Sequence, residues 1–94
     1  MAIYFYDKSK GYSVAVPGSS VEFDSRDAGT IVLALNLSAV RELSATSLRK
    51  RCQKVLLIPH PKTKNVFTRS HLKDNIRKIV GLCDEVGSGV IAWE

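Results

Sequence analysis

The chain has 94 residues, of which 45% are hydrophobic and 24% charged, and its formal net charge is +5. This length and balance fit one domain with one hydrophobic core, and they exclude the disordered and disulfide-dense classes of protein. The longest apolar runs are far shorter than the roughly 20 residues of a membrane-spanning helix, and the first ten residues do not resemble a secretory signal. We therefore expect residues 1–94 to form a single cytoplasmic domain.

The charges are separated along the chain. Residues 41–78 carry eleven Lys or Arg and two acids, a net charge of +9, whereas the remaining residues carry three cations and seven acids, a net charge of −4. Such asymmetry predicts a basic surface that binds a polyanion. The alternative is a basic protein whose charges are all solvated.

Two apolar runs near the N-terminus, residues 2–6 and 12–16, predict a β-hairpin. If Tyr6 lies opposite Tyr12, both faces of the hairpin are largely apolar. The hairpin is then either covered on both sides or offers one face to a partner, and its edge also permits a homodimer. Residues 21–23 predict a further short strand.

Residues 28–43 fit either a helix or a buried strand. Their β-branched start argues for a strand, and Gly29 and Thr30 are poor residues for the first turn of a helix. Asp27 could cap a helix, however, and the second half of the segment contains good helix formers. We favour the helix.

The next segment alternates between basic and apolar stretches. Residues 47–53 predict a short basic helix or a loop, and residues 54–58 (KVLLI) predict a central strand covered on both faces. Pro59 and Pro61 exclude regular structure in the loop that follows. Residues 66–68 (VFT) predict a short strand that pairs back.

The clearest element is a helix over residues 70–86, with Thr68 or Ser70 as its N-cap and Gly87 as its end. One face of it is apolar, through Leu72, Ile76, Ile79, Val80, Cys83 and Val86. Residues 89–93 then predict a buried strand.

Together these elements predict an α+β fold. We expect a two-layer sandwich, with a mixed, mostly antiparallel sheet that includes the N-terminal hairpin, and with two helices packed on one face.

A phosphate site is predicted where the last helix begins, because cations occur there in place of the acids that a helix start favours. Backbone N–H groups and cationic side chains would then act on one anion. Arg69, Lys73 and Arg77 lie four residues apart along one stripe, and Lys62 and Lys64 could reach it from the loop. A second cluster could extend this surface through Arg49, Lys50, Arg51 and Lys54.

These features predict a non-enzymatic protein that binds nucleic-acid phosphates without a base-reading motif. Tyr4, Tyr6 and Tyr12 would add base stacking if their face is open, which slightly favours RNA over DNA. The simpler interpretation is that they cover the rim of the sheet. The main alternative is a small protein-interaction or inhibitor protein, of the phage or mobile-element accessory type, that docks on a larger host protein or another acidic surface.

Catalysis is a minor alternative. His60 and His71 flank the basic loop and could act as base and acid of a ribonuclease, but nothing requires both to reach one phosphate. Cationic neighbours could activate Cys52 as a thiolate, whereas Cys83 lies on an apolar helix face. We expect no catalytic residues, no cofactor and no metal, because the Cys and His spacing lacks a close pair of the zinc type.

Overall fold

The computed structural model describes residues 2–10, 20–57 and 66–94, with side chains in the last range from residue 71 onward. The strands are β1 (Ile3–Asp7), β2 (Ser20–Phe23), β3 (Glu42–Ser44) and β4 (Val90–Trp93). The helices are α1 (Ser25–Leu35), α2 (Ala45–Leu57) and α3 (Val66–Val86), and a short 3-10 helix, η1 (Lys8–Lys10), follows β1.

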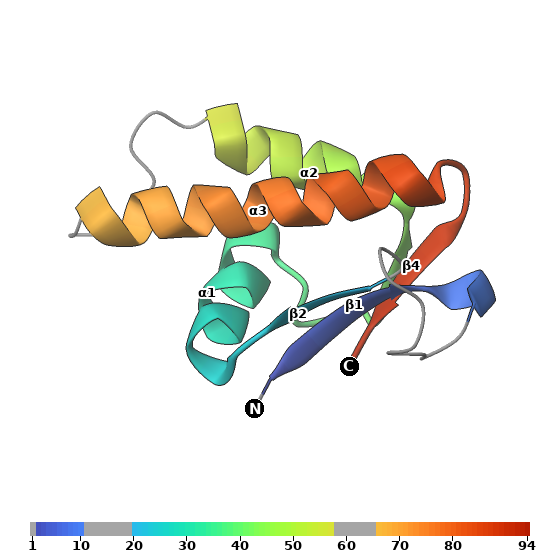
Figure 1. The fold of residues 1–94 in the computed structure, drawn as a ribbon, viewed down its shortest axis with the longest axis horizontal. Helices are drawn as coiled ribbons and strands as arrows, with labels where there is room; N and C mark the ends of the chain where they lie inside the picture. The colour runs from blue at the N-terminus through green and yellow to red at the C-terminus, as the bar shows by residue number, and fades with distance from the viewer. Residues whose placement is uncertain (1, 11–19, 58–65) are drawn as a thin grey trace.

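The strands form one sheet in the order β2-β1-β4-β3, and every neighbouring pair is antiparallel. The three helices lie together on one side of this sheet, with α2 alongside α3 (Figure 1). The predicted α+β class is therefore confirmed, although a third helix is present and the described sheet has no parallel pair.

The N-terminal hairpin has a different second strand from the one we predicted. β1 pairs with β2 on one edge and with β4 on the other, so that Tyr6 faces Ser20 on one side and Ala92 on the other. The short strand expected at residues 21–23 is confirmed within β2. Residues 12–16, the predicted second strand, lie outside the described residues.

Alternation along β1 builds the core. Ile3, Phe5 and Asp7 point toward the helices and are buried, whereas the two tyrosines between them are half-buried on the opposite face. The Phe5 ring packs edge-on against Phe23, with 6.1 Å between centroids, and lies 5.5 Å from the Trp93 ring. This aromatic cluster joins three strands beneath the helical layer.

The helix predicted over residues 28–43 is confirmed for its first part only. Asp24 rather than Asp27 is the N-cap of α1, and its carboxylate accepts the backbone N–H of Asp27 at 2.9 Å. The helix ends at Asn36, which adopts the left-handed conformation with φ 55°. The prediction that the helix continues to residue 43 is wrong, because residues 42–44 form the strand β3.

The central strand predicted at residues 54–58 is wrong. Residues 54–57 continue α2, whose buried face is formed by Leu48, Cys52 and Val55 at helical spacing. A short apolar run does not distinguish a buried strand from a helix, and here packing against α3 selected the helix. Ile58 lies outside the described residues. The predicted basic helix at residues 47–53 is confirmed as part of α2.

The last helix and strand are confirmed, with one correction at the start. α3 begins at Val66, so residues 66–68 are helical rather than a strand, and neither Thr68 nor Ser70 is its N-cap. Gly87 ends the helix with φ 69°, and its N–H donates to the Cys83 carbonyl at 2.9 Å. β4 then lies in the middle of the sheet.

Gly87→Ala should destabilise the protein, whereas Gly81→Ala should stabilise it. An added Cβ meets nothing within 4 Å at either position, so only the backbone conformation differs. Alanine at the positive φ of Gly87 costs about 1 kcal/mol, and alanine within a helix gains roughly 0.5–1 kcal/mol over glycine. Urea unfolding of both variants measures these changes, and shifts of the same sign would contradict this account.

Candidate nucleic-acid interface

The predicted loop-to-helix phosphate site is only partly within the described residues. Lys62 and Lys64 lie outside them, and for Arg69 only the helical backbone is described. Because α3 begins at Val66, Lys73 lies beyond its first turn, where the helix dipole no longer acts on an anion. The argument that cations at a helix N-terminus indicate an anion site therefore does not apply to Lys73 or Arg77.

Two of the predicted cations already form intramolecular ion pairs. Arg77 Nη1 contacts Asp74 Oδ1 at 2.8 Å within α3, and Arg49 Nε contacts Asp84 Oδ1 at 3.1 Å between α2 and α3. All four side chains are largely exposed, so each pair contributes at most about 1 kcal/mol to stability. These pairs reduce the positive charge that this side of α3 offers to a ligand.

Arg51 links α2 to the end of α1. Its Nη1 donates to the carbonyl oxygens of Leu35 at 3.2 Å and Asn36 at 2.9 Å. A cation at a helix C-terminus is favourable, because unpaired carbonyls there carry partial negative charge. The guanidinium is thereby held in one place, while its other N–H groups make no hydrogen bond to any described residue.

The outer side of α2 is a basic surface. The helix has four Lys or Arg and no acid among its 13 residues. Lys50 and Lys54 are exposed, one turn apart, and neither forms an ion pair or hydrogen bond with the part of the chain that the structure describes. We call Lys50, Arg51 and Lys54 the α2 cation cluster.

A groove runs beside this cluster, between the end of α1 and the second half of α2. It has a volume of about 300 Å³ and is lined by Ala34, Leu35, Asn36, Arg51, Lys54 and Val55. Its α1 residues were not predicted as part of a site, since nothing in the sequence shows that residues 34–36 lie against α2.

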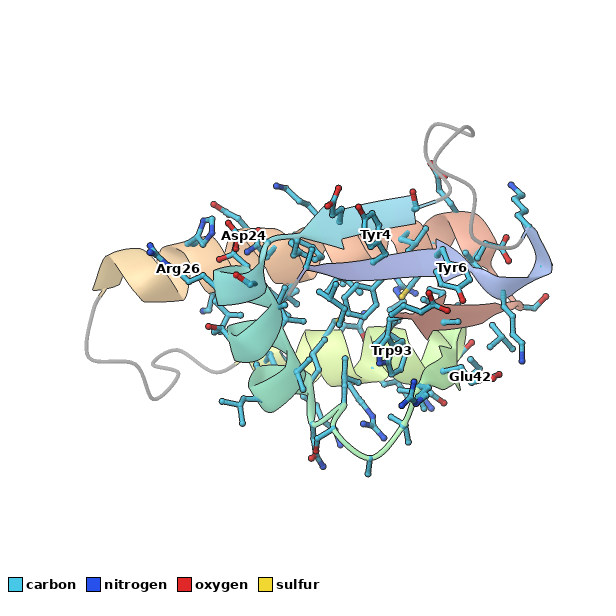
Figure 2. The ribbon with its side chains drawn as sticks, turned by 90° about the horizontal axis from the view of Figure 1, so that it is seen from below. Tyr4, Tyr6, Asp24, Arg26, Glu42 and Trp93 are labelled. Atoms are coloured by element: carbon cyan, nitrogen blue, oxygen red, sulfur yellow. The ribbon has the colours of Figure 1, made fainter. Side chains whose placement is uncertain are left out.

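The tyrosines lie on the other side of the molecule from the cation cluster. Tyr4 and Tyr6 project from the sheet face opposite the helices (Figure 2). Glu22 is directly opposite Tyr4 in the register, and Glu42 is opposite Ala92, the neighbour of Tyr6. The fold therefore does not combine these tyrosines with the α2 cations in one surface, and Tyr12 lies outside the described residues.

His71 connects α3 to α1. Its Nε2 lies 2.9 Å and 3.0 Å from the two carboxylate oxygens of Asp27, and the buried Asn75 amide lies 3.4 Å from the same nitrogen. A neutral Nε2–H would donate to the carboxylate. Because His60 is outside the described residues, the structure does not test the predicted pairing of the two histidines.

Both cysteines are buried and free. Burial, with the charge of Cys83 as a smaller cause, raises the pKa of Cys52 from 9.0 to about 12. Burial, followed by the charge of Asp84, raises the pKa of Cys83 to about 11. Burial therefore argues against the thiolate that was the minor alternative for Cys52, because the thiol faces the core while Lys50 and Lys54 face solvent.

Comparison of the chain with protein-family models, curated proteins and solved structures finds no match to any of them. Among the described residues, no helix has both the length and the hydropathy that a membrane crossing requires. The same residues contain no group of three or more His, Cys, Asp or Glu that could hold a metal ion.

Proposed function

We propose that this chain is a non-enzymatic nucleic-acid-binding protein whose α2 cation cluster contacts backbone phosphates. The observation that supports this proposal is the composition of α2, which carries four cations without a single acid. Lys50 and Lys54 are exposed and have no partner among the described residues, so that binding a phosphate breaks no existing ion pair.

The spacing of the cluster suits a phosphate backbone. Residues four apart on a helix have Cβ atoms about 6 Å apart, which lets Lys50 and Lys54 contact neighbouring phosphates of one strand. Arg51 adds a third positive charge on the groove side of α2. Each phosphate contact releases counterions, and the affinity should therefore fall steeply as salt increases.

Fluorescence titrations of RNA and DNA, single- and double-stranded, at two salt concentrations test the proposal. Lys50→Glu/Lys54→Glu should weaken binding at least about tenfold and reduce the salt slope by about 2. The matched control is Lys10→Glu/Arg26→Glu, which makes the same change in net charge at two exposed positions outside α2. The control should retain most of the affinity, and the RNA titrations test the expected small preference over DNA.

Two results would overturn the proposal. One is an absence of binding to every oligonucleotide at low salt. The other is an equal loss of affinity in the α2 variant and in its control, which would mean that only net charge matters and that α2 is not the site.

A second candidate is a protein-interaction function, including that of an inhibitor. It is favoured by two large apolar side chains, Leu33 on α1 and Leu57 at the end of α2, which are 84% and 80% exposed. The partner would be an acidic protein surface or a second copy of this chain. Either function fits the expected cytoplasmic location. A chain that fails to bind any oligonucleotide would leave this candidate in place.

A further inference from the structure

The groove between α1 and α2 differs chemically from the rest of the basic surface. Ala34, Leu35 and Val55 give it an apolar lining, whereas Arg51 and Lys54 add positive charge on its α2 side. Asn36 adds an amide, which is both a donor and an acceptor. An anion alone needs no apolar surface, so this combination fits a ligand that carries an apolar body next to its charge.

The guanidinium of Arg51 is held before any ligand arrives. Two backbone carbonyls at the end of α1 accept from its Nη1, at 3.2 and 2.9 Å. Since the guanidinium is planar, restraining it restrains the orientation of the plane as well. Unpaired bases commonly stack on arginine planes of this kind.

The volume of the groove limits what can enter. About 300 Å³ is at the lower end of the range for ligand sites, which suits one base and not a base pair. A base in this groove would lie next to Lys54, and Lys50 lies one helical turn before Lys54 on α2. The adjoining phosphates would therefore contact the two exposed lysines.

Resting on the proposed function, we infer that the α1–α2 groove holds one unpaired base of a single-stranded nucleic acid. Arg51 stacks against that base, and Lys50 and Lys54 contact the phosphates on either side of it. Single strands consequently bind more tightly than duplexes of the same length, because a duplex contacts only the lysines. The carboxylates of an acidic peptide would pair with the cations. They would not stack on the guanidinium plane of Arg51, and they would not both donate to and accept from the amide of Asn36.

Filling the groove tests the inference. Ala34→Leu places a larger side chain in it, at a helical and only half-buried position. We expect a roughly fivefold to tenfold loss of affinity for a short single-stranded RNA, the lower end of the range for one stacked base, with duplex binding unchanged. Ala39→Leu is the matched control, since Ala39 is exposed and does not line the groove.

A second variant guards against a folding defect in the first. Asn36→Gly removes the amide while permitting the left-handed backbone at this position, and the backbone carbonyl that accepts from Arg51 remains. It should also weaken single-strand binding and leave duplex binding as it is. Circular dichroism confirms that each variant is folded before it is titrated.

The outcomes separate the inference from the proposed function. Wild-type protein that binds neither single strands nor duplexes refutes the function itself. Equal affinity for both, or single-strand binding that neither groove variant changes, refutes the inference alone. Poly-glutamate that competes with RNA and loses affinity equally in the Ala34→Leu variant also refutes it, because the groove would then bind acidic side chains.

Discussion

Phe5→Ala should lower the free energy of unfolding by about 3–5 kcal/mol, which is the usual cost of deleting a buried phenylalanine side chain. Phe5 is fully buried and is the centre of the aromatic cluster with Phe23 and Trp93. Because a domain of this size is typically stable by only about 5–15 kcal/mol, the variant should unfold at much lower urea concentration. Equilibrium urea unfolding measures the change.

Leu33→Ala is the control for this prediction. It also removes a large apolar side chain, but Leu33 is 84% exposed. Its effect should stay within about 0.5 kcal/mol. Equal losses of stability in the two variants would mean that β1 does not contribute its Phe5 side chain to the core.

Alkaline pH should destabilise the protein through Cys52. Its pKa is about 12 in the folded chain and 9.0 for the unperturbed thiol, because burial disfavours the thiolate. Below pH 9 both states hold the proton, and stability does not depend on this group. Above pH 9 the unfolded chain loses the proton first, so stability falls as pH rises toward 12.

The size of this effect follows from the same linkage. Between pH 8 and about pH 10.5 the Cys52 contribution should lower the free energy of unfolding by about 2 kcal/mol. Cys52→Ala removes this contribution, so its stability should decline less over the same range of pH. Urea unfolding of both proteins at each pH provides the comparison. Parallel declines would show that Cys52 ionises in the folded chain with an ordinary pKa.

Periodic segments were predictable because their pattern is local. The stripe from Leu72 to Cys83 recurs at helical spacing, and Gly87 supplies the positive φ that ends the helix. The α+β class followed from such segments. The run at residues 54–58 could not be assigned in this way, since its burial depends on whether α3 lies beside it.

The candidate site was less predictable than the fold class. Arg51 reaches the carbonyls at the end of α1, and Arg49 contacts Asp84 on another helix. The partners are far apart in the sequence, so neither contact could be predicted from it. The cationic neighbours of Cys52 along the chain also raised the alternative that its thiol ionises to a thiolate. On a helix, however, adjacent residues point in different directions, and Cys52 faces the core while Lys50 faces solvent.

The charge asymmetry, the apolar face of α3 and the terminal strand can be read from the amino-acid sequence, because composition and periodicity do not depend on packing. Which cations keep their charge available to a ligand depends largely on how the helices pack. Packing brings Arg49 beside Asp84 of α3 and holds Arg51 against the α1 carbonyls, whereas Arg77 pairs with Asp74 within its own helix. Packing alone also placed residues 34–36 beside α2, where the proposed base-binding groove lies.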